Sequence, residues 1–101
     1  MINVIAALRI KDGRVAEFIE IFKANVPNVL KEKGCIEYAP TVDLATDLAV
    51  QEKDANVVTI IEKWNSLEDL KAHLVAPHMQ AYGAKVKGLL EARSIKILGA
   101  A

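Results

Sequence analysis

The chain has 101 residues, and its 13 basic and 13 acidic side chains give a formal net charge of zero. These charges are spread along the sequence, so no basic stripe suggests nucleic-acid binding, and no apolar run approaches the ~20 residues of a membrane span. One cysteine cannot form an internal disulfide, and no signal peptide is evident, so we expect a cytoplasmic single domain over residues 1–101. Hydrophobic residues make up 52% of the chain, which favours surface buried in an oligomer.

The segment Ile2–Ile10 is predicted to be the first strand, with apolar residues on both of its faces. Asn3 is an amide placed early in this strand. Its ordinary role would be to tie off the end of a sheet. Its functional role would be to form a hydrogen bond with a ligand oxygen.

A first helix is predicted after a turn, beginning at Asp12 or Gly13. Its apolar residues recur at helical spacing: Val15, Phe18, Ile19, Phe22 and Val26. Pro27 predicts a kink, or a break with a short continuation to about Lys33. Gly34 then predicts the end of the helical region.

The segment Cys35–Leu44 is predicted to be the second strand, and Pro40 indicates a bulge or an edge position within it. Cys35 is a poor candidate for a nucleophile, because no histidine neighbours it in the sequence. Residues 45–56 are predicted to form a polar, irregular connection.

The third predicted strand, Val57–Trp64, opens with a β-branched run. Alternation places Glu62 and Trp64 together on a face that is otherwise apolar. A carboxylate beside an indole on a covered face indicates a pocket. The alternative is that Glu62 pairs with a nearby base and that Trp64 is an ordinary core residue.

Ser66 is predicted to cap the next helix, with Asp69 three residues on as in a capping box. His73 is expected toward the edge of the buried stripe of this helix. That stripe consists of Leu67, Leu70 and Leu74. Pro77–Leu90 is predicted to be a separate helical segment, which places His78 in a first turn where a neutral imidazole is favoured. For each histidine taken alone, a hydrogen bond to a backbone carbonyl is the commoner role.

The last strand is predicted over Glu91–Leu98. The order β-α-β-β-α-β is typical of an α+β fold of the ferredoxin-like split βαβ type, a four-stranded antiparallel sheet with helices on one face. We expect the other face to be apolar and covered by a second copy, giving a homodimer. The residues expected there are Val4, Ala6, Leu8, Val57, Thr59 and Ile61.

Three segments in the same order, KGCIEY, IIEKW and AHLVAPHM, resemble the antibiotic biosynthesis monooxygenase family, and the resemblance covers essentially the whole chain. It is nearest to the small quinol-monooxygenase-like members. The resemblance implies a dimeric α/β barrel with a pocket between sheet and helices in each subunit. It also implies oxygenation of a quinol or related aromatic phenol by molecular oxygen, with no cofactor.

The resemblance also implies roles for individual residues. Trp64 would line the pocket, and Asn3 would occupy the position of the family's strand-one asparagine. His73 and His78 match the two histidines of the third segment. The candidate substrate-binding residues are Trp64, Glu62, Tyr38 and Tyr82.

Oxygen is a triplet, so an electron-rich substrate must supply the electron when no metal or flavin is present. The protein must supply a base, a hydrogen-bond donor for the resulting oxyanion, and a dry apolar cage. We favour His73 over His78 as the base, with Asn3 as the donor. Glu62 is expected to orient whichever histidine lies near it.

Two other functions remain open. The chain also resembles autoinducer-2-phosphate isomerases, whose substrate would need cationic partners such as Arg9, Lys63 or Lys85. A non-catalytic dimeric ligand-binding module is the other alternative. Haem ligation as in some relatives is not favoured, because Gly83 stands near the axial position and no histidine follows His78. No metal-ligand spacing or glycine-rich phosphate loop is present, and the long segment before Val57 leaves the pocket shape open.

Overall fold

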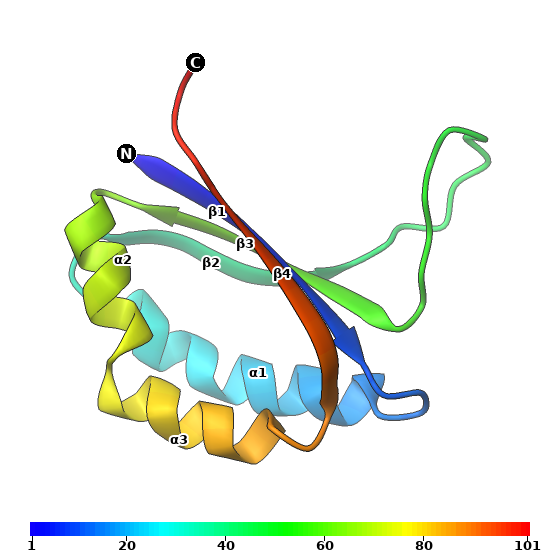
Figure 1. Ribbon diagram of the computed structural model, residues 1–101, viewed down its shortest axis with the longest axis horizontal. Helices are drawn as coiled ribbons and strands as arrows, with labels where there is room; N and C mark the ends of the chain where they lie inside the picture. Colours follow the sequence, from blue (N-terminus) through cyan, green and yellow to red (C-terminus); the bar gives the residue numbers. More distant parts are fainter.

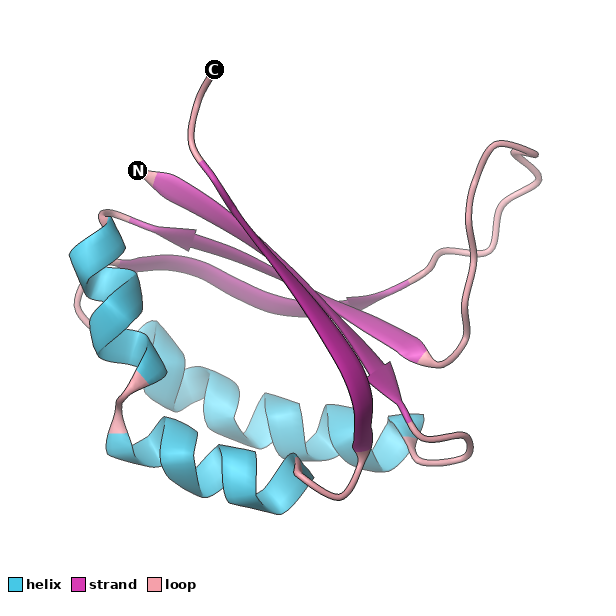
Figure 2. Cartoon of the chain, viewed as in Figure 1, coloured by secondary structure: helices cyan, strands magenta, loops and turns pink.

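The computed structural model describes residues 1–101 as a four-stranded antiparallel sheet with three helices packed on one of its faces (Figures 1 and 2). The sheet order is β2-β3-β1-β4. In chain order the elements are β1 (Ile2–Ile10), α1 (Val15–Leu30), β2 (Cys35–Val42), β3 (Val57–Trp64), α2 (Leu67–Leu74), α3 (Pro77–Val86) and β4 (Leu90–Leu98). The ferredoxin-like split βαβ arrangement predicted from the sequence is therefore confirmed. None of the helices combines the length and apolar character needed to cross a lipid bilayer.

The core lies between the sheet and the helices. Strand alternation and the antiparallel register put every second residue of β1 and β3 on the helix side, so that Val4 is paired with Glu62 and Leu8 with Val58. The prediction that Val4, Ala6 and Leu8 face away from the helices is wrong, since all three are buried in the core. The open face carries Ile5 and Ala7 of β1 instead, together with the three β3 residues that were predicted there, Val57, Thr59 and Ile61.

Helix α1 continues through Pro27 and ends at Leu30, so the predicted break does not occur. The missing N–H of Pro27 costs the helix one hydrogen bond near its end. Val29, in the last helical turn of α1, is fully buried, and its burial holds that turn in the core. The chain leaves the helix through Gly34, whose φ of 79° is in the left-handed region that favours glycine.

Helix α2 begins at the predicted cap, where the Ser66 hydroxyl accepts a hydrogen bond from the Asp69 amide at 3.2 Å. Its buried side differs from the expected stripe. Leu70 and His73 are buried, whereas Leu67 and Leu74 are exposed. Residues 67 and 74 lie seven positions apart and therefore on the same flank of the helix. The short helix meets β3 with the neighbouring side, which carries residues 70 and 73.

Strand β2 lies at one edge of the sheet, as Pro40 indicated, and ends at Val42. Residues 43–56 form an arm that projects away from the sheet (Figure 1). Polar contacts within the arm hold its two sides together. The Gln51 amide donates to the Leu44 carbonyl at 2.6 Å, and Lys53 Nζ donates to the Thr46 carbonyl at 3.0 Å.

Helix α3 is shorter than predicted, ending at Val86, and a turn then leads into β4 at Leu90. The helices cover β2, β3 and β1 but leave β4 bare. Ile95 and Ile97 point to the helix side, yet 50% and 53% of their surface is exposed. Strand β4 is therefore an unpaired edge with apolar residues open to solvent.

Candidate functional site: a buried histidine between Glu32 and Trp64

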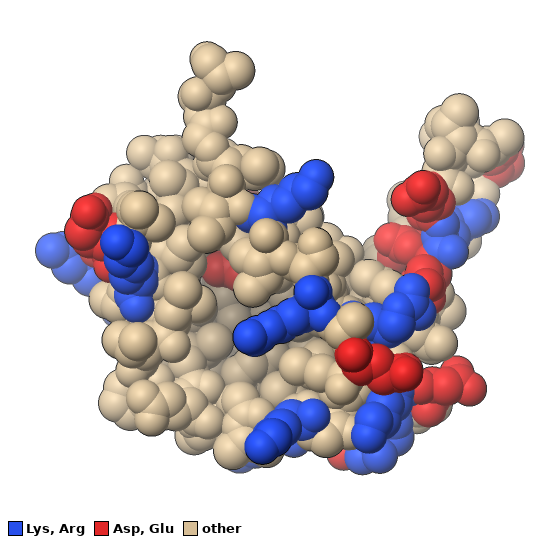
Figure 3. Space-filling model, viewed as in Figure 1, with Lys and Arg blue, Asp and Glu red and all other residues tan.

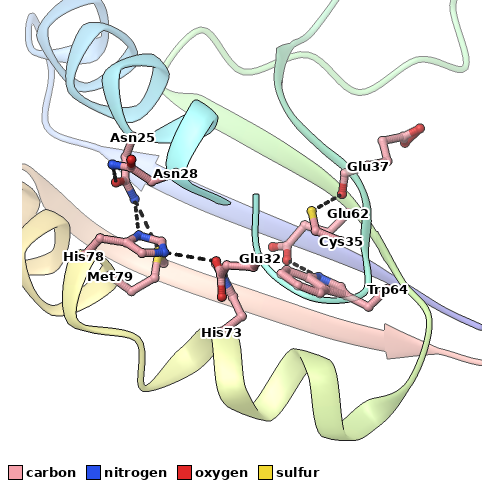
Figure 4. Close-up of polar contacts among 10 residues, drawn as sticks. All are labelled: Asn25, Asn28, Glu32, Cys35, Glu37, Glu62, Trp64, His73, His78 and Met79. Carbon is pink, nitrogen blue, oxygen red and sulfur yellow. Dashed lines mark hydrogen bonds and ion pairs between the residues drawn. The ribbon is translucent and has the colours of Figure 1, made fainter. Parts of the chain in front are cut away.

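The polar side chains of the interior gather where α1 and β3 end and where α2 is followed by α3 (Figure 4). Glu32 comes from the turn after α1, Glu62 and Trp64 from β3, His73 from α2, and His78 from the first turn of α3. Because α2 ends at Leu74 and α3 begins at Pro77, His73 and His78 lie on either side of a short connection, and both face the Glu32 carboxylate.

Glu62 and Trp64 leave β3 on the same side, two residues apart, as alternation requires. Trp64 Nε1 donates a hydrogen bond to Glu62 Oε1 at 3.0 Å. Glu62 is only 7% exposed. Burial raises the pKa of the Glu62 carboxyl above its usual range, and the indole hydrogen bond and His73 offset part of that rise.

The indole of Trp64 is fully buried and lies against the His73 imidazole, with ring centroids 4.7 Å apart. The ring of Tyr38 meets His73 edge-on at 5.4 Å and stacks on Phe22 at 5.1 Å. Tyr82 meets the other edge of this group, 5.7 Å from Phe22. Burial and the nearby Glu62 raise the pKa of both tyrosines, so both phenols stay protonated at neutral pH. The cluster is thus an aromatic enclosure around one imidazole.

His73 is 2% exposed, and its Nδ1 lies 2.7 Å from Glu32 Oε2. His78 Nε2 lies 3.2 Å from the same oxygen, but without the alignment of a hydrogen bond. The other ring nitrogen of His78, Nδ1, contacts Asn25 Nδ2 at 3.2 Å. One carboxylate therefore faces two imidazoles, and an amide of α1 holds the outer one.

The carboxylate that contacts a histidine nitrogen is Glu32, whereas the sequence predicts that Glu62 orients a histidine. Glu62 is engaged by the indole. Glu32 and Asn25 were missed because they lie 41 and 53 residues from their histidine partners in sequence. The only local signal for Glu32 is its position two residues before the helix-ending Gly34.

The structure does not bring Asn3 to this cluster. Asn3 is exposed on the open face of the sheet, opposite Lys63, because it alternates with the buried Val4. Within one chain its amide is on the far side of the sheet from both imidazoles. The pairing of Asn3 with His73 in one pocket is therefore absent from the single chain.

Open space near the cluster lies in two places. A groove of about 170 Å³ runs between α1 and α3 and is lined by Ile21, Ala24, Asn25, Asn28, His78, Ala81, Tyr82 and Lys85. Figure 3 shows a second hollow, between β4 and the helices α2 and α3, with acidic atoms visible inside it. Trp64 and His73 do not line the groove; they are buried deeper in the chain.

Cys35 lies near the same end of the sheet. Burial, together with the charges of Glu32 and Glu62, raises the pKa of the Cys35 thiol to about 11. A thiol with that pKa is protonated at neutral pH and is a poor nucleophile. No group of three or more His, Cys, Asp or Glu side chains is arranged to hold a metal ion.

Fold and site together define a ferredoxin-like α+β protein that holds a buried, acid-paired histidine beside its single indole. Residues 1–85 match the family model described as Antibiotic biosynthesis monooxygenase. The chain belongs to that family.

The chain is similar to named relatives along nearly its whole length. It is 41% identical over 100 residues to the Escherichia coli K12 protein named "Probable quinol monooxygenase YgiN", a match that covers 97% of this chain and 96% of that protein. A solved structure of a conserved protein from Methanosarcina mazei Go1 aligns with a TM-score of 0.82 at 26% identity, covering 96% of this chain and 89% of that one. A Pseudomonas aeruginosa structure aligns with a TM-score of 0.82 at 21% identity over 99% of this chain and 93% of that one, which supports the fold alone.

Proposed function

We propose that this protein is a monooxygenase that uses molecular oxygen to oxidise a quinol or a related aromatic phenol, with no metal or flavin. Family membership and the 41% identical relative named as a quinol monooxygenase support this reaction class. The structural observation that carries it is the pairing of buried His73 with Glu32 on one side and Trp64 on the other. That arrangement offers a base inside an aromatic enclosure.

The chemistry follows from the electronic state of oxygen. A phenolic substrate becomes a far better electron donor once its hydroxyl proton is removed, so the first task of the site is general-base catalysis. His73 supplies an imidazole, the side chain that most often acts as the general base in enzymes. Trp64 and Tyr38 supply aromatic surface for the substrate ring, and Glu62 supplies a polar contact at the same depth. Exclusion of water strengthens each of these interactions.

We propose that the active form is a homodimer. The open face of the sheet presents Ile5, Ala7, Val57 and Ile61 without any cover from the helices. Burying apolar surface is favourable by about 25 cal/mol per Å², so a second copy of the same face is a suitable partner. The single thiol fits a reducing compartment, and we assign the protein to the cytoplasm.

One observation favours a second function. The groove between α1 and α3 combines Lys85 with Asn25, Asn28 and His78. A cation beside amide and imidazole groups suits a phosphorylated, sugar-like ligand, as in an autoinducer-2-phosphate isomerase-like enzyme. We rank this function second because the cation is single and the groove is open.

Oxygen uptake tests the first function. The purified protein, treated with a chelator, is supplied with a panel of quinols, and uptake is compared in the parent, His73→Gln, Trp64→Phe and the exposed control Lys71→Ala. We expect quinol-dependent uptake in the parent and the control, and a loss on the order of 10²–10⁴-fold in His73→Gln. A smaller loss is expected for Trp64→Phe. Thermal melts of each variant separate loss of chemistry from loss of fold.

Uptake that is unchanged in both site variants would remove the proposed site. Isomerisation of a phosphorylated ketose without oxygen consumption would favour the second function.

A further inference from the structure

We propose that Glu32 is the positioning carboxylate of this site: it fixes the His73 tautomer that leaves Nε2 free as the proton acceptor, while His78 serves to hold Glu32. The catalytic consequence rests on the proposed monooxygenase function. The tautomers themselves follow from the hydrogen bonds of the chain and are measured without any substrate. This assignment gives the two histidines different tasks.

The order of donors and acceptors begins on α1. Asn28 Nδ2 donates to Asn25 Oδ1 at 3.0 Å, which fixes the orientation of the Asn25 amide. Its nitrogen then faces His78 Nδ1 at 3.2 Å and donates to it. Because Nδ1 of His78 is the acceptor, the proton of the neutral ring sits on Nε2.

That proton lies on the side of the ring that is close to Glu32, but it is not aligned with the carboxylate for a hydrogen bond. His78 Nε2 is a buried side-chain polar atom with no aligned hydrogen bond, and Glu32 Oε2 lies 3.2 Å from it. A buried N–H without a partner is unfavourable. The nearby carboxylate is therefore the group that His78 attracts and restrains (Figure 4).

The hydrogen-bond partner of His73 fixes the tautomer of that ring in the same way. An ionised carboxylate only accepts hydrogen bonds, so the 2.7 Å contact places a proton on His73 Nδ1. Nε2 of the neutral ring then carries the lone pair. A carboxylate that holds the imidazole of a general base in one tautomer is a recurrent catalytic arrangement, and its removal costs large factors in rate.

The two histidines therefore differ in whether a ring nitrogen is left free to bind a ligand. His78 has one nitrogen engaged by Asn25 and the other 3.2 Å from Glu32 Oε2. His73 uses one nitrogen and keeps the second for a ligand, inside the aromatic enclosure of Trp64 and Tyr38. His73 is the base, and Glu32, His78 and Asn25 are positioning residues.

Nitrogen NMR of the labelled, substrate-free protein tests the assignment directly, because the two neutral tautomers differ in ring ¹⁵N shifts. At neutral pH we expect the Nδ1–H form for His73 and the Nε2–H form for His78. In Glu32→Gln the His73 signals should move toward the Nε2–H form, and in Glu32→Asp they should move less. The exposed Glu20→Gln should leave both rings unchanged. An Nε2–H form for His73 in the parent, or no change in Glu32→Gln, would overturn the proposal.

Kinetics supplies the second readout. With a quinol that the parent turns over, Glu32→Gln should lower kcat by on the order of 10²-fold with little change in KM, and Glu32→Asp should recover part of that loss. A folded Glu32→Gln variant with parental kcat would also overturn the proposal. If the parent oxidises no quinol but shows the expected tautomers, the monooxygenase function fails while the positioning role of Glu32 stands.

Discussion

Glu62 is a carboxyl group that the fold holds in an unfavourable place. It is nearly sealed between the sheet and the helices, and its hydrogen bond comes from a neutral indole. Burial raises the pKa of this carboxyl above the ordinary 4.5. The charged form is therefore costly, and a protein keeps such a group only for a reason other than stability. This cost fits the ligand contact that we propose for Glu62.

The pH dependence of stability tests the state of Glu62. Below pH ~4.5 the group is neutral in the folded and unfolded chains, and its stabilising contribution is lost as pH rises through its raised pKa. Glu62→Gln keeps an acceptor for Trp64 and carries no charge. We expect its free energy of unfolding to exceed that of the parent at pH 8, where a tenfold difference in proton affinity between the folded and unfolded chains corresponds to about 1.4 kcal/mol. The difference should vanish near pH 4. Urea unfolding from pH 4 to 8 measures this, with the exposed Glu20→Gln as control. A difference that does not change with pH would contradict it.

The sequence pointed to some residues of the candidate site and not to others. Trp64 and Glu62 could be paired because two residues of one strand, two apart, must share a face. His73 and His78 could be singled out by their place around Pro77. Glu32 could not, because its contact with His73 exists only after α1 and α2 have packed, and no local pattern records that event.

Among the elements, the start of α2 is fixed by a turn that is distant in sequence. Gly34, between α1 and β2, passes so close to the first turn of α2 that a Cβ on it would lie 2.0 Å from Asp69 Oδ2. The Asp69 amide is the group that Ser66 caps. The Gly34 carbonyl also accepts a hydrogen bond from Asn65 N at 2.8 Å. Packing at one glycine thus positions the helix that carries His73.

We expect Gly34→Ala to lower the free energy of unfolding more than Gly13→Ala does. Both glycines have a positive φ, 79° and 77°, so both substitutions incur backbone strain on the order of 1 kcal/mol. Gly13 has open space around it, whereas Gly34 meets Asp69. We expect Gly34→Ala to lose at least about 1 kcal/mol more than Gly13→Ala in denaturant unfolding.

A double variant locates the source of that difference. Gly34→Ala combined with Asp69→Ala should recover part of the excess loss, because the contacts with Asp69 Oδ2 and Cγ are removed while Asp69 Cβ stays 2.8 Å from the new Cβ. Equal losses at the two glycines would show that the close approach has no energetic weight.

The elements also show where periodicity misleads. The capping box of α2 and the edge position of β2 were readable, because each depends on a local pattern around Ser66 and Pro40. The buried side of α2 was not. A helix of eight residues can meet the sheet with either flank, and the position of β3 decided in favour of His73 over Leu74.

The open face of the sheet is the largest surface of the molecule that the helices leave uncovered and that strand alternation makes apolar. Alternation makes this face apolar along β1 and β3, but which alternate set points outward depends on where the helices pack. Both sets are rich in Val, Ile and Ala, so the sequence predicts the correct outward set for β3 and the wrong one for β1. The register resolves it in favour of Ile5 and Ile61.

A charge placed on this face should separate the proposed dimer. Ile61, 37% exposed in the isolated chain, lies on the open face, whereas Leu48, 63% exposed, lies on the projecting arm. We expect the parent and Leu48→Asp to sediment as dimers at micromolar concentration and Ile61→Asp to sediment as a monomer, because burying an unpaired carboxylate opposes association. A monomeric parent, or an Ile61→Asp variant that stays dimeric, would reject this interface.

The two borders of the sheet are unlike. The β2 border contains Pro40, which offers no N–H to an incoming strand, whereas the β4 border runs from Leu90 to Leu98 without a proline. Growth of the sheet by strand addition is therefore open in one direction only. Two copies joined through β4 would leave a Pro40 border at each outer end, so the addition would stop at a closed pair and would not extend into a fibril.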